Sequence, residues 1–228
     1  MKVPRVVADS LLNRTVQRIR YYRAGVPWYG QLLRLTIECL ATLGLRIEPL
    51  HLFIEAGHSR QPPPLKGRVE DFAIEFLQAS DMAALASIPG RNFSDEQLLL
   101  RLEEGKRCLG IRYRDQIVAF IWFNVNECTV ENYTLFRLRE HEAHLFDAYT
   151  TEAFRGRNLA PILRLRCCEE LARLGRTRCY SVTAAFNTPS LRVKQKLGVQ
   201  TMVPIIYVEL LKRWRFHVLL RRLPRLTR

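Results

Sequence analysis

Hydrophobic and polar positions follow two periods along this chain, and together they predict a mixed α+β fold with a central sheet. Apolar or alternating runs predict strands at 72–77, 108–113, 117–124, 144–150, 179–185 and 203–211. Helical spacing between them predicts helices entered at Ser80-Asp81, at Ser94, after residue 158 and near Thr188. Ser94 and Gln97 form a capping box, which places that helix start.

The first 58 residues carry apolar stripes at helical spacing, including a predicted helix near Tyr29 to Leu43 that Gly44 ends. Three prolines at 62–64 and Gly67 then forbid helix. We therefore predict four parts: an N-terminal helical extension (1–58) that packs on the main domain or on a second chain without completing the core, a Pro-rich linker (59–68), the main domain (69–220) and a basic tail (221–228).

The end of the main domain allows two interpretations. Trp214, Phe216, Val218 and Leu220 alternate as a last strand would. The same residues, set among arginines, also suit a basic amphipathic helix on an anionic membrane surface. The strand is favoured, and the helix remains open.

A polar strand end at residues 149–154 passes through an Arg155-Gly156 turn into an amphipathic helix. The first N–H groups of a helix have no intrahelical partner and lie at the positive end of its dipole. An anion can accept several hydrogen bonds there, and Arg155 and Arg157 add charge. A second strand end at 179–185 leads through Asn187 into another capped helix. The turn therefore predicts a phosphate site.

These two elements, in this order and spacing, resemble the Gcn5-related N-acetyltransferase (GNAT) family over about residues 69 to 211. The matching positions are Arg155, Asn158 and Ala160 in the phosphate turn, and Asn187, Ser190, Leu197 and Gly198 in the second element. Asn158 stands where the family usually has glycine, and asparagine tolerates the left-handed conformation better than most residues. Lys194 stands where the family often carries a tyrosine general acid, four residues after the serine.

The resemblance implies the GNAT fold: a mixed, mostly antiparallel sheet that splays at an acyl-CoA cleft, with helices on both faces. It also implies acetyl-CoA or another acyl-CoA as co-substrate, and an amine as acceptor. The pantetheine arm would lie along Ala148, Tyr149 and Thr150, and the pyrophosphate on the turn. The implied donor-binding residues in the turn and the second element are Arg155, Gly156, Arg157, Asn158, Leu159, Ala160, Asn187 and Ser190.

Three residues are catalytic candidates. His144 matches the position of the general base in histone-type members, and Asp147 is a carboxylate within an apolar strand, where burial without a partner or a task is costly. Asp147 is slightly preferred, although a structural salt bridge explains it equally well. Because strand residues alternate faces, the two can share a face only across a bulge. Lys194 is a candidate proton donor to the leaving thiolate if its pKa is lowered.

The net charge of +14 points to acidic partners, among them acyl-CoA, an acyl carrier protein and, peripherally, an anionic membrane. Nucleic acid is disfavoured because exposed aromatics do not interleave with the basic residues. Six cysteines without a C-x-x-C pair indicate a reduced cytoplasmic protein, in which Cys167 or Cys168 as a catalytic thiol is the weaker interpretation. No secretion signal is predicted at the start. No metal site is predicted, because His141-Glu142-x-His144 is too compressed for the helical zinc motif.

The main functional prediction is a CoA-dependent N-acyltransferase acting on a primary amine, as a monomer or homodimer. One alternative is a long-chain N-acyltransferase that takes its donor from an acyl carrier protein, which the +14 surface would match. The other is a non-catalytic acyl-CoA sensor or basic docking module, since the usual tyrosine acid is missing.

Overall fold

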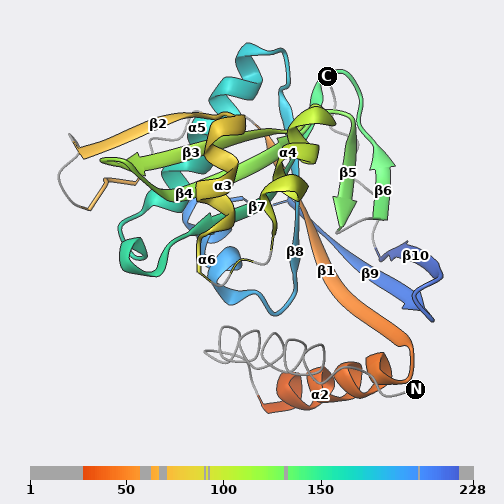
Figure 1. The fold of residues 1–228 in the computed structure, drawn as a ribbon. Helices are drawn as coiled ribbons and strands as arrows, with labels where there is room; N and C mark the ends of the chain where they lie inside the picture. Colours follow the sequence, from red (N-terminus) through yellow and green to blue (C-terminus); the bar gives the residue numbers. More distant parts are fainter. Residues whose placement is uncertain are drawn as a thin grey trace.

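The computed structural model describes residues 28–56, 63–66, 71–89, 91, 93–130, 133–199 and 201–220. Its centre is an eight-stranded sheet with the order β10-β9-β1-β8-β7-β4-β3-β2 (Figure 1). The strands of this sheet are β1 (Leu45–Ala56), β2 (Phe72–Leu77), β3 (Arg107–Tyr113), β4 (Gln116–Asn124), β7 (Glu142–Thr150), β8 (Arg178–Ala184), β9 (Thr201–Leu210) and β10 (Trp214–Leu219). A separate hairpin joins β5 (Glu127–Val130) to β6 (Tyr133–Arg137).

The helices lie on both faces of the sheet, so the predicted mixed α+β fold is confirmed. They are α2 (Trp28–Thr42), α3 (Met82–Ala86), α4 (Asp95–Glu103), α5 (Leu159–Arg173) and α6 (Thr188–Lys196), with 3₁₀ turns at Ala79–Asp81 and Glu152–Phe154. No helix in the described ranges is both long and apolar enough to cross a membrane.

Alternating strand residues build a core on each face. Leu163, Cys167 and Leu171 of α5 pack against residues of β3, β4 and β7 on one face. On the other face, Trp122 of β4 packs with Met82 and other apolar residues of α3 and α4. The β5–β6 hairpin covers that second face farther along, over β8, β1 and β9. The site between β7 and β8 therefore lies between two packed layers.

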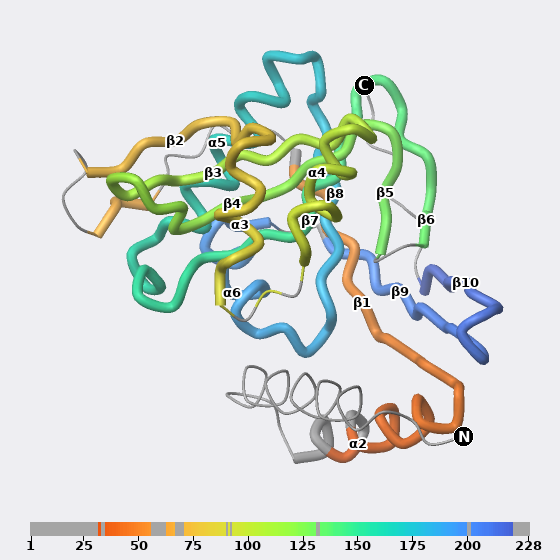
Figure 2. The backbone as a smooth tube through the Cα atoms, in the orientation of Figure 1, coloured from red at the N-terminus to blue at the C-terminus, as the bar shows by residue number. Residues whose placement is uncertain are grey.

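The structure corrects the prediction for residues 45–56. They form strand β1, which lies inside the sheet and pairs antiparallel with both β8 and β9 (Figure 2). The run Leu50–Ile54 is mostly apolar and suits either a buried helix or a buried strand. The spacing of its hydrophobic residues therefore does not distinguish the two. The prediction that 1–58 is a helical unit outside the core is wrong for this strand.

The predictions for the segments before β1 and at the C-terminal end of the main domain have separate outcomes. Helix α2 ends at Thr42, and Gly44 follows with φ 87°, as expected for a glycine that stops a helix. The segments 1–27 and 57–62, and the basic tail 221–228, lie outside the described residues, so the domain boundary at 59–68 stays a prediction. Residues 214–219 form β10, which favours the strand over the amphipathic helix.

Most local predictions in the main domain are confirmed. Helix α4 begins with the predicted capping box, because Ser94 Oγ accepts from the Gln97 N–H and Gln97 Oε1 accepts from the Ser94 N–H. Helix α6 begins at Thr188, near the predicted position, and its cap is Asn187, whose Oδ1 accepts from the Ser190 N–H at 3.2 Å. The β5–β6 hairpin was not predicted.

Candidate active site

Strands β7 and β8 are the parallel pair of the sheet, and they separate part of the way along. Their pairing runs from Glu142 and Arg178 to Leu145 and Ser181. Beyond Leu145, the edge of β7 that faces β8 has no strand partner within the described part of the chain, over residues 146–150. The sheet is therefore splayed where the resemblance implied a cleft for the donor.

The phosphate turn lies at the end of β7 that leads out of this gap. Gly156 has φ 80° and Asn158 has φ 66°, so both adopt the left-handed conformation, and Asn158 is the N-cap of α5. Within the described ranges, no N–H group of residues 156–160 donates to another backbone or side-chain atom. Such a run of free donors at a helix start fits an anion.

The Pro-rich segment braces this turn. The Asn158 side chain donates to the Pro64 carbonyl at 2.9 Å, and the Lys66 N–H donates to the Arg157 carbonyl at 3.2 Å. Lys196 of α6 donates to Asn158 Oδ1 at 3.0 Å, which adds a third cation beside Arg155 and Arg157. Asn158 thus has a structural task, which explains how the turn accommodates it in place of glycine.

A β-bulge brings Asp147 onto the face that carries α3 and α4. Phe120 and Trp122 of β4 oppose Tyr149 and Phe146, so β7 has one residue more than β4 in this interval, and Asp147 takes φ 46°. His144 lies on the same face, with its ring stacked on Phe146 at 5.5 Å. The bulge that the sequence analysis required for the two candidates to share a face is therefore present.

Both oxygens of Asp147 are bound by arginines. Arg91, in the loop after α3, contacts Oδ1, and Arg101 of α4 donates to Oδ2 at 2.7 Å. The guanidinium of Arg101 also lies over the ring of Phe93 at 4.3 Å. This is the salt bridge that the sequence analysis kept as the alternative for Asp147.

His144 lies deeper, with 1% of its surface exposed. Its Nδ1 accepts from the Thr129 N–H at 3.3 Å, across to the β5–β6 hairpin. Burial, together with the positive charges of Arg164 and Lys194, lowers the pKa of His144 to about 3. Its imidazole is therefore neutral near pH 7, and it binds a proton weakly.

Lys194 lies in a buried ionic cluster that the sequence did not reveal. Its Nζ donates to Ser181 Oγ at 2.5 Å and to Glu55 Oε1 at 3.2 Å. Arg164 of α5 holds Glu55 in a bidentate pair through Nε and Nη2, with Nη2 at 2.6 Å from Oε1, and Ser181 donates to the same carboxylate. We call Glu55, Arg164, Ser181 and Lys194 the Glu55 cluster.

The environment of the Glu55 cluster lowers the pKa values of both Glu55 and Lys194. Burial alone would raise the pKa of Glu55, but Arg164 and Lys194 outweigh it and hold that pKa at about 2. Burial lowers the pKa of Lys194 to about 7, assisted by Arg164 and opposed by Glu55. Ser181 is the last β8 residue paired with β7, so this lysine reaches the point where the gap opens.

The remaining predicted residues lie at the start of α6 or in the core. Asn187 and Ser190 begin α6, and Ser190 Oγ lies 3.4 Å from Thr183 Oγ1 of β8. Cys167 is fully buried, and burial raises the pKa of its thiol well above the usual range, which disfavours a catalytic thiol there. Arg91, Arg101, Glu55, Arg164 and Ser181 were not singled out from the sequence, because only the fold brings them to these candidates.

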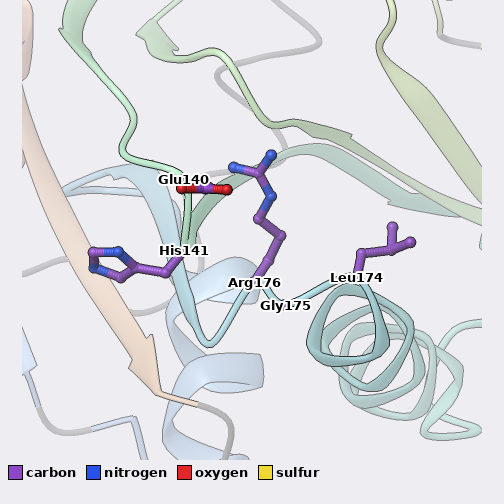
Figure 3. Close-up of a pocket in the computed structure, with 5 residues that line it drawn as sticks. All are labelled: Glu140, His141, Leu174, Gly175 and Arg176. Atoms are coloured by element: carbon purple, nitrogen blue, oxygen red, sulfur yellow. The ribbon is translucent and has the colours of Figure 1, made fainter.

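A surface hollow lies at the opposite end of the same strand pair. Figure 3 shows the residues that line it, which are Glu140 and His141 before β7 and Leu174, Gly175 and Arg176 after α5. Parallel strands begin together, so this hollow lies at the ends where β7 and β8 start, away from the phosphate turn. It brings together none of the predicted site residues.

Several solved structures have a similar fold. A Drosophila protein matches with a TM-score of 0.54 and 19% identity over 79% of this chain and 57% of its own. A tandem GNAT protein from the clavulanic acid biosynthesis pathway matches with a TM-score of 0.51 and 14% identity, over 75% of this chain and 57% of its own. This chain thus spans a little more than half the length of either.

A Salmonella typhimurium protein described as an acetyltransferase, solved with its cofactor acetyl-CoA, matches at a TM-score of 0.44 and 18% identity, over 56% of this chain and 78% of its own. A comparison with curated proteins found no significant match. The family model for the acetyltransferase (GNAT) family matches residues 73–199, more than half of the chain. With the splayed strands and the phosphate turn in place, this match shows that the chain belongs to the acetyltransferase (GNAT) family.

Proposed function

We propose that this chain is an acyl-CoA-dependent N-acyltransferase that uses acetyl-CoA or another acyl-CoA and acylates a primary amine. The observation that supports this most is the separation of β7 from β8 beyond Leu145 and Ser181, directly beside the phosphate turn. An extended thioester arm can enter such a gap and form strand-like hydrogen bonds with β7, while its pyrophosphate meets the start of α5.

In this proposal, each part of the donor has a place. The pyrophosphate lies on the N–H groups of residues 156–160, beside Arg155 and Arg157. The pantetheine arm pairs with Ala148, Tyr149 and Thr150, whose β8-facing edge is open. Asn187 and Ser190 line the other side. Leu159 and Ala160 contribute backbone donors only, so their side chains can pack inward.

Lys194 is the proposed proton source for the departing CoA thiolate. The amine attacks the thioester carbon, the C–S bond breaks, and the thiolate takes a proton from the Lys194 ammonium. With a pKa of about 7, Lys194 is a stronger acid than an ordinary lysine and than a free thiol, which ionises at about 8.5. Glu55 and Ser181 hold its Nζ at the start of the gap.

For the proton of the amine we propose Asp147 rather than His144. Asp147 lies at the bulge with 13% of its side chain exposed, so a substrate that replaces one arginine contact can reach it. His144 is enclosed and already accepts a hydrogen bond.

The donor site is tested by calorimetry with acetyl-CoA and a matched pair of glycine variants. Gly156 and Gly105 have φ of 80° and 81°, and an added Cβ meets nothing within 4 Å at either. Gly156→Ala and Gly105→Ala should therefore lose similar stability, by about 1 kcal/mol. Only Gly156→Ala should weaken acetyl-CoA binding, by about tenfold or more. Equal affinities in the two variants would remove the proposed site.

The donor class and the acceptor are tested separately. Acyl-CoAs of increasing chain length, and the same acyl groups on an acyl carrier protein, are compared as donors with a panel of primary amines. The net charge of +14 favours the carrier-protein alternative enough to include it. Turnover only with the carrier protein would replace CoA as the donor. Tight acyl-CoA binding without turnover on any amine would favour the non-catalytic sensor.

A further inference from the structure

Strands β1, β9 and β10 share an apolar face that lies outside the proposed active site. Residues directly opposite one another in neighbouring strands point to the same face. Ile47 pairs with Val208, which pairs with Phe216, and Pro49 pairs with Ile206, which pairs with Val218. Trp214, opposite Leu210, continues this row at the turn end of the strands. We call this the Trp214 face.

The two faces of these strands differ sharply in how well they are covered. Val203, Ile205 and Tyr207 of β9 point to the other face and are buried beneath the β5–β6 hairpin. On the Trp214 face, Trp214 is 63% exposed, and Phe216 and Val218 are each 48% exposed. Leu210 and Met202 are also exposed there. A contiguous exposed apolar patch of this kind usually marks an interaction surface.

The described turn at one end of the Trp214 face is basic, and the sequence around it carries one sign of charge. From Leu210 to Arg228 the sequence has seven basic residues and no aspartate or glutamate. The turn between β9 and β10 carries Lys212 and Arg213, and the guanidinium of Arg213 lies 5.9 Å from the centre of the Trp214 ring. Two copies of such a surface would repel each other, which disfavours a second copy of this chain as the occupant.

We propose that the Trp214 face lies on an anionic lipid surface. Trp214 and Phe216 would enter the interfacial layer, where aromatic side chains are favoured, and Lys212 and Arg213 would meet the lipid phosphates. This is peripheral binding through strands, since the described helices offer no membrane span. The inference is independent of the proposed acyl transfer.

Co-sedimentation with vesicles tests the proposal on the full chain. The vesicles are phosphatidylcholine alone, or phosphatidylcholine with about one-third phosphatidylserine. Wild type should bind the anionic vesicles at low salt and lose at least about tenfold in partitioning when salt screens the surface. Equal binding to both vesicle types, or no binding to either, would overturn the proposal.

Variants separate the apolar and the charged contributions. Trp214→Ser with Phe216→Ser should reduce partitioning at least about tenfold. Leu100→Ser is the control, because Leu100 is an exposed leucine of α4, outside the Trp214 face. It should leave the partitioning unchanged. Lys212→Glu with Arg213→Glu should abolish binding, whereas Arg107→Glu with Arg173→Glu, the same change of net charge elsewhere, should weaken it much less.

Fluorescence places the contact. In a Trp28→Phe background the remaining tryptophans are Trp214 and the buried Trp122. Anionic vesicles should shift the emission to the blue and protect it from an aqueous quencher. Unshifted emission despite sedimentation would put the contact elsewhere. Dimers in analytical ultracentrifugation that disappear with Trp214→Ser would show that a second copy occupies the face, against the proposal.

Discussion

Replacing Glu55 with glutamine tests both the position of β1 in the sheet and the Glu55 cluster. The substitution keeps the size of the side chain and removes its charge. Glu55 accepts hydrogen bonds from Arg164, Ser181 and Lys194, and all four side chains are buried. Glutamine leaves two cations without a counter-ion in the core, and its own N–H group is directed at donors.

The size of the effect follows from the pKa of Glu55. A carboxyl whose pKa falls from 4.5 to about 2 on folding contributes about 3 kcal/mol of stability near neutral pH. Breaking a buried ion pair by removing one partner costs about 3–5 kcal/mol. Lys194 can release its proton and so relieve part of the imbalance, which places the expected loss for Glu55→Gln at about 3 kcal/mol.

Urea and thermal unfolding measure this loss, and Glu75→Gln is the matched control. Glu75 also lies on a strand and pairs with an arginine, Arg112, but its side chain is 48% exposed. Its loss should stay below about 1 kcal/mol. Glu55→Gln should lower the melting temperature by about 6–12 °C, at about 2–4 °C per kcal/mol for a chain of this size.

The pH dependence gives a second check. Because folding lowers the pKa of Glu55, its stabilisation is complete above about pH 4.5 and is lost as the pH falls through about 2. The difference between wild type and Glu55→Gln should therefore shrink in acid. If Glu55→Gln costs no more than Glu75→Gln at neutral pH, Glu55 is not buried against Arg164 and the place of β1 in the sheet is wrong.

Three further predictions concern turnover and linkage. With an acceptor identified, Asp147→Asn should lower kcat about tenfold or more with little change in acetyl-CoA affinity, while His144→Ala should do less; the reverse order in steady-state kinetics would move the base to His144. The kcat of wild type should fall as the pH rises through about 7, because Lys194 then loses the proton it donates, and this limb should be missing from the pH profile of Lys194→Arg. Folding lowers the pKa of Lys194 to about 7, so below that pH the native lysine is a buried cation that destabilises the fold. The free energy of unfolding of Lys194→Met relative to wild type should therefore be greatest below about pH 7. Unfolding curves should show this difference shrink as the pH rises above 7.

The sequence by itself determined the family of this chain and the ends of several helices. Ser94 with Gln97 places the start of α4, Gly44 the end of α2, and Asn187 the start of α6 within one residue. These features depend on contacts between residues that are close in the sequence, so the sequence alone is enough to predict them. The phosphate turn is of the same kind, because it needs only a strand end, a glycine and a helix start.

Only the tertiary structure decided where β1 lies and what surrounds the catalytic candidates. A short apolar run can form either a helix or a strand. Residues 45–56 form a strand because they pair with β8 and β9, which lie more than 120 residues away in the sequence. Glu55 meets Lys194 for the same reason. The arginine partners of Asp147 also come from the fold, because only the bulge and α4 bring Arg101 to it. The burial and the charge environment of a residue depend on neighbours that are distant in the sequence. Residue types can therefore suggest a site, but the fold determines the pKa values and contacts of its residues.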